Sequence, residues 1–142
     1  MNEGVFVDSS GLYAVFQAED ASHVIASTVW SELLEADIPL HTSDFVLLEL
    51  TALLQRRLGI AAVDALNTYI VPWVNVVWMN EAVYVRGVSA VLAARRRDLS
   101  LVDCTSFAIM RSLGLRKVFT FDPHFVEQGF EVLPAAAPSS GS

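Results

Sequence analysis

The chain has 142 residues and a formal net charge of −7, and 54% of its residues are hydrophobic. Its single cysteine excludes a disulfide framework and a cysteine metal site. The acidic charge counts against a protein that binds nucleic acid through a basic surface alone. The length indicates one domain, which we expect to span residues 1–133, with a flexible tail over residues 134–142.

The mean hydropathy of +0.47 is high for a soluble domain. The most apolar stretch, residues 60–79, is nevertheless interrupted by Asp64, Asn67, Pro72 and Asn75, which opposes a membrane-spanning helix. The first residues lack the positive charge of a secretory signal. We therefore expect a cytoplasmic protein without a membrane segment, whose spare apolar surface is covered by another chain, with Trp30, Trp73 and Trp78 in the core or in a dimer contact.

Hydrophobic periodicity and capping residues predict alternating strands and helices along the chain. The predicted strands and extended segments cover residues 5–7, 38–41, 74–79, 117–121 and 130–133. The predicted helices begin after residues 8–11 and cover residues 21–36, 42–58, 61–69, 80–97 and 101–113, with a short helical turn at 122–123. This alternation predicts an α/β fold, a three-layer α/β/α sandwich around a mostly parallel sheet.

Two aspartates follow predicted strands, Asp8 after residues 5–7 and Asp122 after residues 117–121. In an open parallel sheet, ligands bind beyond the carboxyl ends of the strands, so both side chains are expected at one edge. The alternative for each is a helix N-cap, a position that Asp favours. Pro123 after Asp122 would then suit the first helical position. The two roles are compatible, because a capping carboxylate can also bind a metal.

Two further acids complete the candidate site. Asp103 stands in the first turn of a predicted helix, where the pattern Ser100-x-x-Asp103 resembles a capping box. Glu49 is embedded in an apolar helix, where a carboxylate needs a partner to offset its desolvation. Carboxylates that converge would repel one another unless a cation lies among them, and hard oxygen ligands suit Mg²⁺ or Mn²⁺. Such ions support phosphodiester hydrolysis.

Four segments in order resemble the PIN-domain nucleases, and among them the VapC-type ribonuclease toxins. They are VFVDSS ending the first strand, TSDFVLLE around Glu49, LSLVDCTSF around Asp103 and VFTFDPHF around Asp122. The resemblance covers residues 5 to about 133, and all four family acids are matched.

This resemblance implies a Rossmann-like fold and Mg²⁺- or Mn²⁺-dependent cleavage of RNA by a homodimer, often with a VapB-type antitoxin as partner. It implies that Asp8, Glu49, Asp103 and Asp122 are the catalytic and metal-binding residues. Ser9, Ser106 and Thr120 fall where the family often has hydroxyl residues, and they are interpreted as groups that orient the acids, or equally as caps or core contacts.

The hypothesis for the mechanism has a metal-activated water attack phosphorus in line and leave a 5′-phosphate, with Asp8 and Asp103 as direct ligands. Glu49 and Asp122 would bind through water, or one would accept the proton. A phosphoacceptor receiver domain is disfavoured, because only Asp8 follows the first strand. A non-catalytic RNA- or protein-binding module, and a nuclease that acts on DNA, stay open.

Other polar residues receive a structural interpretation. The run Arg95-Arg96-Arg97 is expected to be a solvated helix end, since cations suit a helix C-terminus. Asp98 is expected to be solvated as well. His124, close to Asp122, is interpreted as an exposed loop histidine and is left out of the metal ligands.

Overall fold

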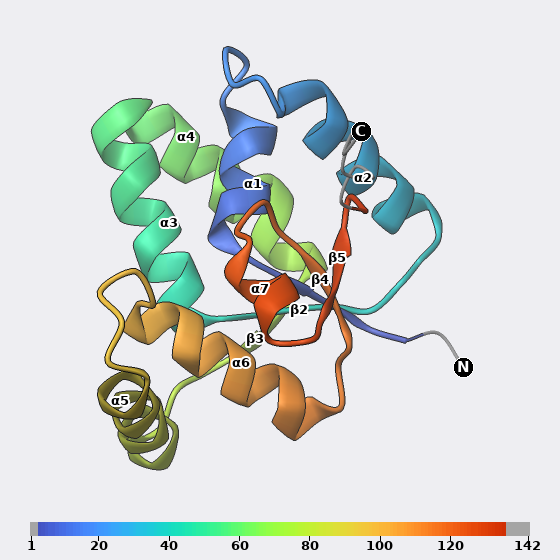
Figure 1. Ribbon diagram of the computed structural model, residues 1–142. Coiled ribbons are helices and arrows are strands. Elements are labelled where there is room, and N and C mark those ends of the chain that lie inside the picture. The colour runs from blue at the N-terminus through green and yellow to red at the C-terminus, as the bar shows by residue number, and fades with distance from the viewer. Residues whose placement is uncertain (1–2, 136–142) are drawn as a thin grey trace, which may run out of the picture.

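The computed structural model describes residues 3–135. Its five strands form one parallel sheet in the order β3-β2-β1-β4-β5, as the alternating sequence pattern predicts (Figure 1). The strands are β1 (Val5–Val7), β2 (Leu40–Ser43), β3 (Asn75–Val77), β4 (Lys117–Phe119) and β5 (Glu131–Leu133). The predicted tail falls mostly on residues 136–142, which lie outside the described residues.

Helices cover both faces of the sheet, which confirms the three-layer α/β/α class (Figure 1). The helices are α1 (Ser9–Phe16), α2 (His23–Glu35), α3 (Asp44–Arg57), α4 (Ile60–Ala65), α5 (Glu81–Ala94), α6 (Leu101–Leu113) and α7 (His124–Glu127). A π-helical turn, η1 (Leu66–Ile70), and a 3₁₀ turn, η2 (Val71–Trp73), follow α4. Among the described residues, none of these helices has the length and apolar character needed to cross a bilayer.

The neighbouring strands β1 and β4 each contribute to two separate cores, because successive side chains of a strand point to opposite faces. In β1, Val5 and Val7 pack with α1, α2 and the end of α3, while Phe6 packs with α6 and α7. In β4, Phe119 joins the first core and Val118 the second. β1 and β4 are therefore covered on both faces, as a parallel sheet between helical layers requires.

Several helix starts follow the predicted capping chemistry. The Ser43 hydroxyl accepts the backbone N–H of Val46 at the start of α3, and Asn80 caps α5. At α6, Ser100 and Asp103 form both hydrogen bonds of a capping box, which confirms that prediction. These caps fix where α3 and α6 begin, directly beside the sheet edge.

Three predicted boundaries are wrong for identifiable reasons. The strand expected over residues 38–41 continues to Ser43, because pairing with β3 extends it into the predicted helix start. The helix expected over 61–69 changes to π and 3₁₀ turns before and around Pro72, which cannot continue an α-helix. The helix expected to reach residue 97 ends at Ala94, since Arg95 adopts a left-handed conformation with φ of 52°.

Candidate active site

The candidate site lies at the carboxyl edge of the sheet, where β1 and β4 end side by side. Val7 of β1 pairs with Phe119 of β4, and the backbone N–H of Asp8 donates to the Phe119 carbonyl over 3.0 Å. Asp8 and the segment of residues 120–122 therefore leave adjacent strands at the same level. The structure confirms that the two strand-end aspartates share one edge.

Asp8 is buried, with 3% of its surface exposed, and it occupies the position before α1 without making a side-chain capping bond. Its Oδ2 instead accepts hydrogen bonds from the hydroxyls of Thr120 and Ser10, each over 2.8 Å. Asp8 therefore occupies the N-cap position that the alternative predicts, but its side chain does not cap the helix. Burial raises the pKa of Asp8, and the charge of Asp122 adds to that rise, while the two hydroxyl bonds oppose it.

Backbone N–H groups orient the hydroxyls of Thr120 and Ser10 so that both donate to Asp8. The Thr120 oxygen accepts the N–H of Asp122 and the Ser10 oxygen accepts the N–H of Phe121, both over 2.9 Å. Each oxygen therefore receives a backbone proton and gives its own to the carboxylate. Ser10 was not among the residues proposed from the sequence, although it stands two positions after Asp8 in the same turn.

Asp103 reaches the same edge from α6. Its side chain is 13% exposed, and its Oδ2 accepts the backbone N–H of Ser100 while lying 3.7 Å from Nδ1 of His124. Burial first, and then the charges of Asp122 and Asp8, raise the pKa of Asp103 to about 6, against the opposing hydrogen bonds from Ser100. Asp103 is therefore both a helix cap and a member of the acidic cluster.

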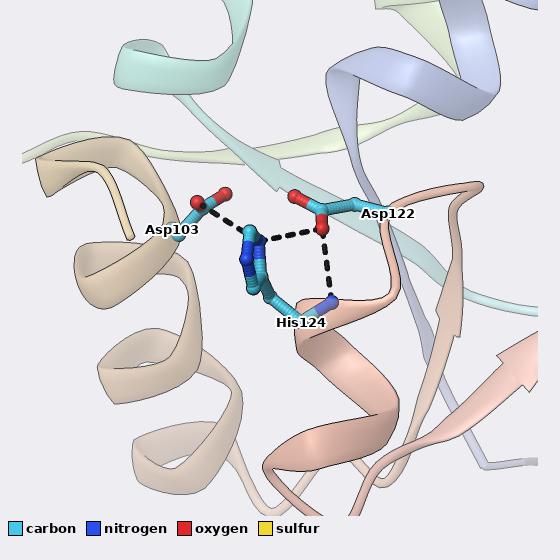
Figure 2. A group of neighbouring side chains, drawn as sticks. All are labelled: Asp103, Asp122 and His124. Atoms are coloured by element: carbon cyan, nitrogen blue, oxygen red, sulfur yellow. Dashed lines mark hydrogen bonds and ion pairs between the residues drawn. The ribbon is translucent and has the colours of Figure 1, made fainter. Parts of the chain in front are cut away.

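Asp122 lies opposite Asp103, and the ring of His124 stands between the two carboxylates (Figure 2). The Asp122 Oδ1 accepts the backbone N–H of His124 over 2.9 Å. Pro123, not Asp122, occupies the cap position of α7, so the expectation of Pro123 at the first helical position is wrong. Ligand atoms of Asp103, Asp122 and His124 lie within 4.8 Å of one another.

Glu49 connects to this edge through Ser9, whose hydroxyl donates to Oε1 of Glu49 over 2.7 Å. Glu49 is exposed, and its neighbour Leu48 is 71% exposed. The sequence argument that Glu49 lies in apolar surroundings and needs a partner is therefore wrong, because this apolar face of α3 is open to solvent. Asp8 and Glu49 are not members of the group whose ligand atoms lie within 4.8 Å.

The three hydroxyl residues proposed to orient the acids differ in their contacts. Thr120 bonds to Asp8 and Ser9 bonds to Glu49. Ser106 is fully buried on α6, one helical turn after Asp103, and its hydroxyl has no hydrogen-bond partner among the described residues. Two of the three thus contact a candidate acid directly.

His124 is the polar residue that the sequence interpretation misplaced. It begins α7, its side chain is 16% exposed, and its Nδ1 lies 2.7 Å from Oδ1 of Asp122. Asp98 is half exposed but paired, since its carboxylate bonds both Arg96 and His124. The signal in the sequence was the spacing Asp122-x-His124, which places both residues in one turn.

The cluster has the chemistry of a divalent-cation site. Asp8, Asp103 and Asp122 are close enough for their charges to raise pKa values, which is the cost of gathering carboxylates without a cation. Their oxygen donors suit Mg²⁺ or Mn²⁺, and the buried, unpartnered Nδ1 of His124 faces the same space. The donor set therefore fits a bound metal ion.

Comparison with known proteins decides the family. The model of the PIN domain matches residues 5–131 of the chain. The chain belongs to the PIN domain family. This PIN domain is 35% identical, over 92% of its length and 98% of the relative's, to the 23S rRNA-specific endonuclease VapC20 of Mycobacterium tuberculosis.

Solved structures agree with this assignment. The crystal structure of VapC20 from M. tuberculosis, described as a sarcin-ricin loop cleaving toxin, has a TM-score of 0.79 to this PIN domain at 34% identity, covering 89% of this chain and 95% of that one. FitAcB from Neisseria gonorrhoeae has a TM-score of 0.67 at 16% identity over 90% and 95% of the two chains. A toxin–antitoxin complex from Klebsiella pneumoniae scores 0.57 at 15% identity over 84% and 87%. The last two show the fold alone.

Proposed function

We propose that this PIN domain is a metal-dependent endoribonuclease, the toxin of a VapBC-type pair, and that 23S rRNA contains its substrate. The observation that carries the proposal is the convergence of Asp8, Asp103 and Asp122 on one sheet edge in a chain that is 35% identical to a 23S rRNA endonuclease over 92% of its length. Glu49, tied to the edge by Ser9, would complete the four acids.

In this proposal Asp8, Asp103 and Asp122 hold Mg²⁺ or Mn²⁺, and Glu49 contributes as a further acid. The bound ion would supply positive charge for the phosphate and lower the pKa of a bound water. The hydroxyls of Thr120 and Ser10 keep the Asp8 carboxylate in place and favour its charged form. The Ser9 hydroxyl donates to Glu49, which ties this exposed carboxylate to the first residue of α1, next to Asp8.

A bound metal ion would explain how a chain with a net negative charge can bind RNA. At −7 the chain would repel an RNA backbone, and its basic residues are partly engaged, as Arg96 pairs with Asp98 and Glu127. A divalent cation among the acids inverts the local charge at the point where the phosphate binds. Binding of RNA is therefore expected to require the metal as much as cleavage does.

A homodimer and an antitoxin partner are also part of the proposal. Several large apolar side chains are exposed, including Trp78 at 72% and Trp73 at 66%, whereas Trp30 is buried. Exposed apolar surface of this kind is typical of protein–protein contacts. Light scattering during gel filtration should give twice the chain mass of 15.5 kDa, and a mass that stays at the single-chain value would contradict the dimer.

The nuclease proposal is tested on a synthetic RNA hairpin that copies the sarcin-ricin loop of 23S rRNA, beside total RNA, with Mg²⁺, Mn²⁺ or EDTA. Wild-type protein is compared with Asp8→Asn and with Asp64→Asn, a control at an exposed acid of α4. Cleavage that needs metal, persists in Asp64→Asn and disappears in Asp8→Asn supports the proposal. Metal-dependent RNA binding without cleavage under any ion would identify a non-catalytic binding module instead.

A further inference from the structure

The imidazole of His124 lies inside the acidic cluster rather than on a loop surface. Its Nδ1 is 2.7 Å from Oδ1 of Asp122 and 3.7 Å from Oδ2 of Asp103, and the three residues offer ligand atoms within 4.8 Å of one another (Figure 2). The ring reaches this position because His124 starts α7 directly after the β4 edge. The Nδ1 atom of His124 is therefore placed to bind a metal ion together with the carboxylates of Asp103 and Asp122.

The Nδ1 atom is buried and, among residues 3–135, has no hydrogen-bond partner with acceptable geometry. The Asp122 carboxylate is at ion-pair distance, but the contact is not a hydrogen bond. A buried polar atom without a partner costs free energy, so its persistence calls for a ligand. A metal ion in the cluster would supply one.

The opposite ring nitrogen of His124 is already engaged. Nε2 lies 3.2 Å from Oδ2 of Asp98, which can only accept when ionised, so Nε2 carries the proton. A neutral imidazole with its proton on Nε2 presents a lone pair at Nδ1. A carboxylate behind the distal nitrogen is the usual arrangement around metal-binding histidines, because it fixes the tautomer and the ring orientation.

Asp98 is itself held in place by Arg96. The guanidinium donates to both carboxylate oxygens of Asp98, over 3.0 Å and 2.7 Å, and to Glu127 over 2.9 Å. These bonds tie the loop before α6 to α7, the helix that His124 begins. Salt bridges this exposed add little stability, so their effect is chiefly on geometry.

We propose that His124 binds the metal through Nδ1, with Asp98 as its positioning residue, so that the centre is a mixed oxygen and nitrogen site that prefers Mn²⁺ to Mg²⁺. The inference rests on the proposed function for the existence of the metal centre. Mg²⁺ favours oxygen ligands and water, whereas an imidazole ligand suits first-row transition ions. His124 thereby sets which ion the enzyme selects.

The experiment uses Mn²⁺ as the probe and needs no RNA. The full chain is loaded with Mn²⁺, and pulsed electron paramagnetic resonance is used to detect coupling to a directly bonded imidazole nitrogen, with and without ¹⁵N-labelled histidine. The chain has three histidines, His23, His41 and His124, and loss of the coupling in His124→Ala, with the coupling kept in His23→Gln, assigns it to His124. His23 is the control, because its ring contacts the Ala14 carbonyl and pairs with no carboxylate of residues 3–135.

The expected result is a nitrogen coupling in wild type and His23→Gln that is absent in His124→Ala. Titrations should show that His124→Ala loses about tenfold or more of its Mn²⁺ affinity, with a smaller loss for Mg²⁺, so that the preference for Mn²⁺ narrows. Asp98→Ala should also lower the ratio of Mn²⁺ to Mg²⁺ affinities, and Asp64→Ala should leave this ratio unchanged. If Asp98 had a purely structural role, Asp98→Ala would lower the affinities for both ions by the same factor.

Three outcomes would overturn the proposal. If Mn²⁺ binds wild type without nitrogen coupling, and Asp103→Asn abolishes that binding, the carboxylate centre stands and the nitrogen ligand is wrong. If His124→Ala leaves the ratio of Mn²⁺ to Mg²⁺ affinities unchanged, the selectivity claim is wrong. If wild type binds neither ion, the inference fails together with the metal centre of the proposed function.

Discussion

The hydroxyl of Thr120 donates a hydrogen bond of 2.8 Å to Oδ2 of Asp8, which joins two residues 112 positions apart in the chain. The bond links the ends of the neighbouring strands β1 and β4 at the point where the sheet stops. Because the Thr120 oxygen also accepts the N–H of Asp122, one side chain organises two of the candidate metal-binding acids. Substitution of Thr120 therefore tests how strongly metal binding depends on a residue that does not itself bind the metal.

We expect Thr120→Val to lower the Mn²⁺ affinity by about tenfold, because the isosteric side chain removes both hydrogen bonds without opening a cavity. Without the hydroxyl, the pKa of the buried Asp8 rises further, so protons compete better with the metal. The loss should be larger at pH 6 than at pH 8. Thr120→Ser, which keeps the hydroxyl, is the control, and an equal affinity in wild type and Thr120→Val would contradict the role.

Ser9 is expected to act through Glu49. In Ser9→Ala the exposed glutamate loses the hydrogen bond of 2.7 Å that fixes it, and RNA cleavage should fall by about tenfold. Glu49→Gln should reduce cleavage more strongly, and the double variant should be no slower than Glu49→Gln alone. Multiplied losses in the double variant would show that Ser9 has a separate role.

The layer order and the strand-end aspartates could be predicted, because they depend on local pattern. Alternating buried strands and capped helices define the sheet, and Asp8 and Asp122 follow from the rule that strand ends in a parallel sheet share an edge. The helix start at Ser100 could be predicted in the same way, because the capping box involves only the four residues from Ser100 to Asp103.

What could not be predicted depends on contacts between distant segments. The exposure of Glu49 is set by what covers α3, and the sequence of the helix alone suggests burial. The position of His124 depends on α6 and on the loop that holds Asp98, which lies 26 residues away. Trp73 and Trp78 are exposed, as a subunit contact would require, but the sequence could not separate them from the buried Trp30.

The metal-free protein should become less stable as the pH rises from about 4 to about 6. The pKa of Asp103 is 3.8 ordinarily and about 6 in the fold, so in this window the folded state binds more protons than the unfolded state. The free energy of unfolding therefore falls with rising pH, by up to about 3 kcal/mol. His124, whose pKa is raised above 6.5 by the Asp98 hydrogen bond and the neighbouring acids, adds a further loss above pH 6.5.

Urea unfolding in EDTA at pH 4.5, 6 and 8 measures this dependence. Asp103→Asn should reduce the fall below pH 6, because the amide does not titrate and its oxygen can still accept the Ser100 N–H. A fall from Asp8, whose pKa burial also raises, should remain. The fall above pH 6.5 should remain in that variant. Stability that rises between pH 4.5 and 6, or an unchanged profile in Asp103→Asn, would contradict the assignment.

The contact between α5 and α6 should be sensitive to a single methyl group. A Cβ added at Gly87 of α5 would lie 2.5 Å from Cγ2 of Thr105 and 3.0 Å from Cδ1 of Leu101, both on α6. Gly87→Ala gains helix propensity but forces the helices apart, so we expect a net loss of about 1–3 kcal/mol of stability.

The double variant Gly87→Ala/Thr105→Ser isolates the clash. Serine lacks the Cγ2 methyl but keeps the hydroxyl that donates to the Val102 carbonyl, so it removes the contact and preserves the local hydrogen bond. The double variant should therefore lose less stability than the sum of the losses in the two single variants, with a difference of about 0.5–3 kcal/mol. Additive losses in urea unfolding would mean that α6 yields at this point, and that the helix carrying Asp103 is not held by close packing against Gly87.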